Sequence, residues 1–183
     1  MTTATAPGPK PAHGKKHYFG KYRGSVLNNF DPMGIGRVLV EVTGIISLSS
    51  SWAMPCFPVA GMQSGFIAVP PIGAGVWIEF EGGDPDRPIW TGCYHSTRAE
   101  VPPLVQLFPP PIPTMTMHTP LMNSIQLSDA PPTPISGGIV LQSRSGAMIV
   151  VNDLGITLSD GKGAMVTLMG GVVTVNLGAL IVK

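Results

Sequence analysis

The sequence predicts an all-β protein in two parts, a small N-terminal barrel and a C-terminal needle that several copies of the chain build together. Three observations support this prediction. Aliphatic residues recur in pairs through the last third of the chain, and glycines separate the pairs. Short segments with alternating apolar residues fill much of residues 17–95, without helical periodicity.

The C-terminal pairs define short strands. Successive side chains of a strand point to opposite faces, so the two members of a pair share one face. The residues between the pairs are mostly β-branched, and those after them are often polar. One face of this sheet is therefore aliphatic. The pairs are Ile139/Leu141, Ile149/Val151, Ile156/Leu158, Val166/Leu168, Val173/Val175 and Leu180/Val182.

A repeat underlies the pairs, because Gly146-Ala147-Met148 recurs as Gly163-Ala164-Met165, 17 positions later. A repeat of this size indicates a solenoid or a β-helix. In one chain, such narrow strands would leave the aliphatic row half exposed and the sheet edges unpaired. We expect an intertwined trimeric β-helix, or β-prism, with the first five pairs as the trimer core. The repeat alone does not set the number of chains.

The composition fits a turn-rich, packed protein. Of 183 residues, 44% are hydrophobic and only 11% are charged, with 23 glycines and 20 prolines. A disordered chain would be richer in charge. The net charge of +1 gives no global attraction to nucleic acid or anionic membrane. Cys56 and Cys93 lie in predicted strands and lack metal or redox spacing, so we expect reduced, packed thiols.

The N-terminal residues 1–16 are expected to form a flexible arm. Basic residues gather between Lys10 and Arg23, so contact with an acidic partner is the alternative. The first residues contain no apolar core of an ordinary secretory signal, and no apolar run reaches the length of a membrane helix. We therefore expect that any export of this chain uses another route.

Several segments of residues 17–95 predict barrel strands. In the clearest one, Val38, Val40 and Val42 share one face. The segment that begins at Trp52 contains prolines, which favour an edge or bulged strand. Further strands are expected at 76–81 and 89–94, on either side of a tight loop. This spacing predicts a small barrel.

Motifs within this barrel resemble a known family. They are Trp52-Ala53, Pro58-Val59-Ala60-Gly61, Gly65-Phe66, Pro70-x-Ile72-Gly73, Val76-Trp77-Ile78-Glu79-Phe80, Gly83-Asp84-Pro85-Asp86-Arg87-Pro88 and Gly92-x-Tyr94. The run resembles the oligonucleotide/oligosaccharide-binding (OB) barrel of contractile-injection spikes. That family comprises the phage baseplate assembly protein V group, the VgrG proteins of type VI secretion and the spikes of phage-like extracellular injection particles.

The resemblance implies an OB-fold barrel over 17–95, followed by a trimeric β-helical needle over 137–183, with a start near 123 as the alternative. It implies a homotrimer, a separate tube or baseplate hub protein at the barrel end, and a tip protein of the PAAR type at the other end. The residues expected to contact the tip protein are Leu180, Val182 and Lys183. Prolines in residues 96–136 make regular sheet unlikely through much of that segment, which is expected to be a connector.

No catalytic, cofactor or metal site is expected. Asp84 and Asp86 lack the later ligands of a calcium loop, and Gly73-Ala74-Gly75 lacks the lysine of a phosphate loop. Glu100 and Asp129 do not form the carboxylate pair of the lysozyme domain found in one branch of the family. His13, His17, His95 and His118 lack metal-ligand spacing, and no histidine follows them, so the family's His-x-His iron site is not expected.

The predicted function is a structural spike that pierces a target membrane at the tip of a contractile injection apparatus. It would be assembled in the bacterial cytoplasm and be part of a virion baseplate or of a phage tail-like particle. Two alternatives remain. An OB protein for single-stranded nucleic acid would use Trp77 and Trp90, but few cations accompany them, so no nucleic acid is expected. A trimeric receptor-binding adhesin or tail fibre would bind glycans along its needle.

Overall fold

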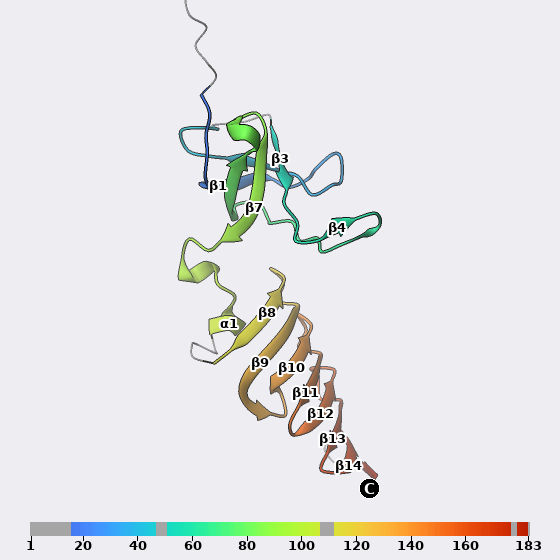
Figure 1. The fold of residues 1–183 in the computed structure, drawn as a ribbon. Helices are drawn as coiled ribbons and strands as arrows, with labels where there is room; N and C mark the ends of the chain where they lie inside the picture. Colours follow the sequence, from blue (N-terminus) through green and yellow to red (C-terminus); the bar gives the residue numbers. More distant parts are fainter. Residues whose placement is uncertain (1–15, 47–50, 107–111, 177–178, 183) are drawn as a thin grey trace, which may run out of the picture. The chain divides into compact units, whose positions relative to one another are not determined.

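The computed structural model describes residues 16–46, 51–106, 112–176 and 179–182 (Figure 1). The chain divides into two compact units, residues 1–98 and 99–183. Strands dominate both units, so the predicted all-β class is confirmed. The helical segments among the described residues are short: η1 (Glu81–Gly83), η2 (Arg98–Glu100) and α1 (Pro103–Gln106). None of the described helices is long and apolar enough to span a membrane.

The first unit contains a closed five-stranded barrel, which confirms the predicted small barrel. Its strands follow the order β1-β2-β3-β7-β6, and β6 pairs back with β1. All barrel pairs are antiparallel except β3 with β7. The strands are β1 (Tyr22–Asn28), β2 (Val38–Glu41), β3 (Trp52–Pro55), β6 (Gly75–Phe80) and β7 (Pro88–Tyr94).

The barrel core follows from the alternation in the sequence. Val38, Val40 and Val42 are fully buried, as their shared face predicted. Trp90 is 5% exposed, and its indole Nε1 donates a hydrogen bond of 3.1 Å to the carbonyl oxygen of Gly36. The ring of Phe57 packs edge-on against this indole. A satisfied donor allows the large indole to be buried without a polar penalty.

Two expectations for the barrel are wrong. Strand β3 is not at an edge, because it pairs with β2 on one side and β7 on the other. Pro55 is its last residue, so the missing amide interrupts no further pairing, and Cys56 N donates to the Trp90 carbonyl oxygen. The cysteines are free as predicted, but both Cys56 and Cys93 are exposed rather than packed. Cys56 directly follows β3.

The second unit is an eight-stranded antiparallel sheet in which each strand pairs with the next along the chain (Figure 1). The 17-residue repeat corresponds to one hairpin, because β11 and β12 recur as β13 and β14. The strands are β8 (Thr114–His118), β9 (Ser124–Thr133), β10 (Ser136–Gln142), β11 (Met148–Asn152), β12 (Gly155–Ser159), β13 (Met165–Met169), β14 (Val172–Val175) and β15 (Leu180–Val182).

The sheet begins at Thr114, inside the segment that was expected to be a connector, although much of 96–136 lies outside the strands as the prolines predicted. The prolines lie where the ladder needs no amide donor. The pairing of β9 with β10 passes from Ser128 opposite Gly138 to Thr133 opposite Ser136, so Pro131 and Pro132 fall in the irregular stretch between these pairs. Proline is tolerated at such irregularities.

The hairpin turns depend on glycine. Gly155, the first residue of β12, has a φ of 139°, and a Cβ there would clash with the carbonyl oxygen of Leu168 on β13. The backbone of β13 can approach only because glycine has no side chain.

Candidate trimer interface

The register of the sheet aligns the predicted trimer-core residues in two columns on one face. Ile139 pairs with Val151, Ile156 with Leu168, and Leu168 with Val173. The second column contains Leu141, Ile149, Leu158, Val166 and Val175, again in consecutive pairs. Since paired residues in a sheet point to the same side, the ten residues form one aliphatic surface. We call this surface, with its extensions described below, the aliphatic face.

The aliphatic face is half exposed in a single chain. Ile139 is 46% exposed and Ile156 is 37% exposed, and the other isoleucines and leucines of the predicted core fall between these values. The three valines on β13 and β14 are half-buried. Apolar side chains arranged continuously and left this exposed mark an interaction surface. The predicted residues therefore lie together, and the chain by itself covers them incompletely.

On β10 to β12 the residues between the two columns are buried within the chain itself. Val140 is 3% exposed, Val150 1% and Thr157 2%. They lie opposite one another in consecutive strands, on the other face of the sheet. Each chain therefore covers these three side chains itself, whereas the two aliphatic columns are open to a partner.

The aliphatic face extends beyond the predicted core. Leu127 pairs with Ile139 and Ile125 with Leu141, and Met115 and Met117 of β8 continue the two columns. All four side chains are exposed. The spacing of Ile125 and Leu127 fits the pair pattern, but the methionines of β8 were missed because a Met-x-Met segment among prolines gives a weak strand signal.

Side chains at the hairpin ends fix the turns. The Oδ1 atom of Asp160 accepts hydrogen bonds from the backbone N of Lys162, at 2.7 Å, and of Ala164, at 2.9 Å. These bonds to backbone N–H groups hold the pKa of this carboxyl below its usual value. The Oδ1 atom of Asn176 similarly accepts from the backbone N of Met165 at 3.0 Å. Such turns pin the register that aligns the columns.

The C-terminal strand β15 ends the described sheet. Leu180 pairs with Val175 and is 57% exposed, while Val182 pairs with Val173. Lys183, the third predicted contact for a tip protein, lies outside the described residues. Within the described chain, β15 has a pairing partner only on the β14 side.

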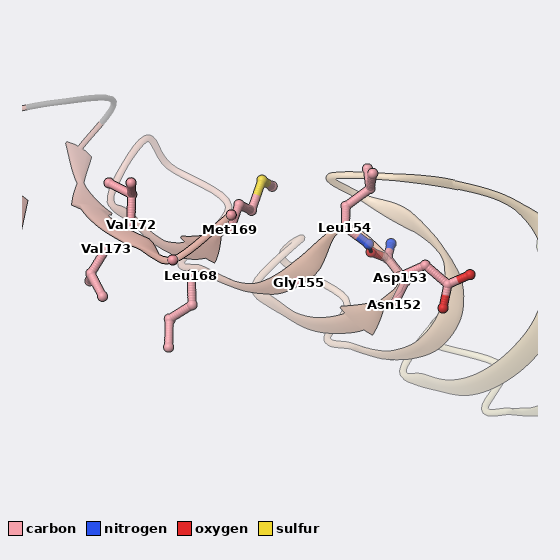
Figure 2. Close-up of a pocket in the computed structure, with 10 residues that line it drawn as sticks. Asn152, Asp153, Leu154, Gly155, Leu168, Met169, Val172 and Val173 are labelled. Carbon is pink, nitrogen blue, oxygen red and sulfur yellow. Dashed lines mark hydrogen bonds between the residues drawn. The ribbon is translucent and has the colours of Figure 1, made fainter. Parts of the chain in front are cut away.

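An open hollow of about 400 Å³ lies between two neighbouring hairpin ends (Figure 2). It is lined by residues 152–155 and 168–173. In Figure 2, Leu168 and Val173 point to one side of the sheet, and Met169 and Val172 point to the other. Asp153 is the only ionisable side chain in this lining. One carboxylate provides no acid–base pair, so the hollow has no evident catalytic chemistry.

The polar groups of the barrel that were considered as possible metal ligands make local contacts with the backbone. In the loop before β7, Asp86 N donates to Asp84 Oδ1 at 3.0 Å, and Arg87 N donates to the Asp84 carbonyl oxygen. His17 lies with its Nδ1 3.1 Å from the carbonyl oxygen of Gly82. No group of three or more His, Cys, Asp or Glu side chains that could hold a metal ion occurs among the described residues.

The two units match two families. Residues 22–95, from β1 to the end of the barrel, match the type VI secretion system/phage-baseplate injector OB domain. Residues 114–181, which are almost the whole eight-stranded sheet, match the phage baseplate V C-terminal trimerisation domain. The chain thus carries an injector OB domain followed by a baseplate V trimerisation domain. The predicted resemblance is thus confirmed, and the trimerisation domain supports a homotrimer.

Curated relatives include spike proteins of the VgrG type. The chain is 54% identical over 50 residues to the actin cross-linking toxin VgrG1 of Vibrio cholerae serotype O1, a match that covers 27% of this chain and 5% of that protein. It is 46% identical over 50 residues to the type VI secretion system spike protein VgrG3 of the same serotype, again over 27% of this chain and 5% of the relative. The chain thus matches a small fraction of these relatives.

Proposed function

We propose that three copies of this chain form a structural spike that pierces a membrane at the tip of a contractile injection apparatus. One observation carries the proposal: the aliphatic face lies, half exposed, on a sheet that matches a trimerisation domain. Three such faces packed together would exclude water from both columns. Complete burial of an aliphatic side chain stabilises by about 1.5–3 kcal/mol, and each side chain of the face is repeated in every copy.

The proposed task requires stiffness rather than catalysis. A sheet whose aliphatic face is covered by two other chains can open locally only by breaking contacts between chains. The register of the columns is continuous from β8 to β15, so the contact would extend along the whole sheet. We propose no enzymatic activity for this chain.

Substitution within the aliphatic face tests the proposed trimer. Ile156→Asp or Leu168→Asp would place carboxylates in the middle of the buried columns, where unpaired charges are strongly unfavourable. We expect each variant to be monomeric or aggregated when its mass is measured by light scattering after gel filtration. Lys162→Asp, in the exposed turn between β12 and β13, is the matched control and should stay trimeric. A soluble, heat-resistant trimer of Ile156→Asp would rule out this interface.

We propose one partner for the barrel and another for the needle. A tube or baseplate hub protein would bind the barrel, and a conical tip protein of the PAAR type would cover the end of the needle at Leu180, Val182 and Lys183. The exposed Leu180 on the terminal strand supports such a cap. We propose that the spike is assembled in the bacterial cytoplasm, becomes part of a phage or phage tail-like particle and contacts the target membrane transiently.

A pull-down with a PAAR-type protein tests the proposed cap. The full chain should retain the tip protein, and a chain that lacks residues 176–183 should not, because the deletion removes β15. The mass of the truncated protein should still be that of a trimer, since the ten predicted core residues remain. Equal retention by both trimers would refute the cap.

A further inference from the structure

The barrel carries a hairpin that belongs to a separate sheet. Strands β4 (Ala60–Gly61) and β5 (Ser64–Gly65) pair only with each other among the described residues, in the connection between β3 and β6 (Figure 1). The backbone N of Phe66 donates a 3.0 Å hydrogen bond to the carbonyl oxygen of Val59, which closes the base of the hairpin. We call residues Val59–Ile67 the hairpin arm.

The hairpin arm is apolar and almost entirely uncovered. Met62 at its end is 96% exposed, Ile67 71% and Val59 61%. A two-stranded hairpin is marginally stable in water unless a further surface covers it. Apolar side chains concentrated on such an element therefore indicate that another surface packs against it.

A second apolar segment lies at the same end of the barrel. Phe30 is 83% exposed, Met33 64% and Ile35 43%, in the turn between β1 and β2. Asn29 Nδ2 donates to the carbonyl oxygen of Pro70 at 3.1 Å, which joins this turn to the segment that follows the arm. We call residues Phe30–Ile35 the Phe30 loop. The arm and the loop thus give the barrel two exposed apolar elements.

The arm and the chain on either side of it contain no charged residue. From Val42 to Ile78 the sequence contains no Asp, Glu, Lys, Arg or His. In the Phe30 loop the one charged side chain, Asp31, is ion-paired with Arg37 at 2.7 Å. Nucleic acids and highly charged proteins are recognised through side chains of opposite charge. This surface lacks such side chains. It fits an equally uncharged apolar surface.

We propose that the hairpin arm of each copy packs against the Phe30 loop of the neighbouring copy and so closes a ring of three barrels. This inference rests on the homotrimer of the proposed function. Because the trimerisation domain tethers three identical barrels, each arm meets another copy at a high effective concentration. A contact between two different patches of identical subunits closes into a ring when the rotation suits the number of copies.

Cysteine cross-linking in the full-length protein tests the ring. In a background with Cys56→Ser and Cys93→Ser, Met62 or Ile67 of the arm is changed to Cys together with Phe30 or Met33 of the loop. After mild oxidation, at least one of the four pairs should give bands of two and three linked chains on a non-reducing gel. Each single-cysteine variant is the matched control: with one cysteine per chain it can link at most two chains, so it should give no three-chain band and far less of the two-chain band.

The remaining outcomes overturn the proposal in distinguishable ways. If light scattering shows a trimer but all four pairs run at the mass of one chain, the barrels do not contact one another in this way and the needle trimer stands. If the protein is monomeric in solution, both the ring and the proposed trimeric spike fail. Bands of one chain that shift only in mobility would show that the arm meets its own loop, which also excludes the ring.

Discussion

At the residue scale, Asp31 organises the turn between β1 and β2. Its Oδ1 atom accepts hydrogen bonds from Arg37 Nη2 at 2.7 Å, Arg37 Nε at 3.0 Å and Met33 N at 3.0 Å. Its Oδ2 atom accepts from the backbone N of Ile35 at 3.0 Å and of Arg37 at 3.2 Å. The guanidinium of Arg37 is the main reason that the pKa of this carboxyl lies well below its usual range, and the backbone donors add to the effect.

This network predicts a pH-dependent effect of Asp31→Asn. A carboxyl whose pKa is lower in the folded than in the unfolded protein stabilises the fold above its unfolded pKa, and this stabilisation is lost as the pH falls. The unfolded value is near 3.8. We therefore expect Asp31→Asn to lower the melting temperature at pH 7, and the difference from wild type to shrink as the pH falls below about 4.

Thermal melts followed by circular dichroism between neutral and acid pH measure this difference. Glu41→Gln, at an exposed position at the end of β2, is a matched control that removes a carboxylate without this network. A gap between wild type and Asp31→Asn that stays the same at all pH values would contradict an electrostatic role. The run Asp31-Pro32-Met33-Gly34 is typical of a turn, but the sequence does not reveal Arg37 as the partner of Asp31, because that contact depends on how the turn folds back.

At the scale of elements, local alternation predicted strands better than proline content did. Val38, Val40 and Val42 and the C-terminal pairs were assigned to the correct strands and faces, because side-chain alternation is a property of the strand itself. Proline was misread at Pro55 and Pro131. Its effect depends on whether a neighbouring strand needs the missing amide, and that is decided by pairing between distant segments.

The candidate interface was predictable only in part for the same reason. The pairs revealed which residues share a face, but not that consecutive strands pair as an antiparallel meander. The burial of Val140 and Val150 within one chain also depends on that pairing. The hairpin arm was not predicted. Its sequence does not differ from that of an ordinary turn, and only the structure shows that the barrel leaves its apolar side chains exposed.

Because the repeat is one hairpin, removing it should preserve the sheet. Deletion of residues 147–163 joins Gly146 to Ala164 and recreates the Gly-Ala-Met sequence found at both places. Strand β10 would then pair with β13, and Leu141 would meet Val166 on the same aliphatic face. We expect a trimer with a somewhat lower melting temperature, because two strands of core are lost. Light scattering and thermal melts measure both properties.

Deletion of Thr157 alone is the control for register. Loss of one residue within a strand moves every following side chain of that strand to the opposite face. We expect this much smaller deletion to abolish the trimer, whereas the 17-residue deletion of the repeat retains it. If the longer deletion were the more damaging of the two, the hairpin would not be the structural unit.

At the scale of the whole molecule, the proposed trimer is held by apolar contacts rather than by charge. Only 11% of residues are charged, and the exposed pairs Lys21–Glu79 and Arg87–Glu81, each 2.7 Å, lie within one barrel. Exposed ion pairs contribute little and are screened by salt. Burial of aliphatic side chains is not weakened in this way.

The assembly should therefore tolerate salt. We expect a mass of three times 19.2 kDa by light scattering, unchanged as NaCl is raised from about 0.1 to about 1 M, over which the Debye length falls from about 10 to about 3 Å. Dissociation at the higher concentration would indicate that charged contacts hold the chains together. Filter binding at low salt completes the test, since retention of a single-stranded oligonucleotide would favour the nucleic-acid alternative.

Because each repeat is one hairpin, the length of the sheet is set by the number of repeats. Neighbouring strands are spaced by about 4.8 Å, so each duplicated hairpin would lengthen the sheet by about 10 Å. Recombination at the matching Gly-Ala-Met sequences could add or remove one 17-residue repeat. Neither face of the sheet would change its pattern of side chains. Under the proposed function, repeats could be added or removed in fixed steps to suit envelopes of different thickness, while the barrel stays unchanged.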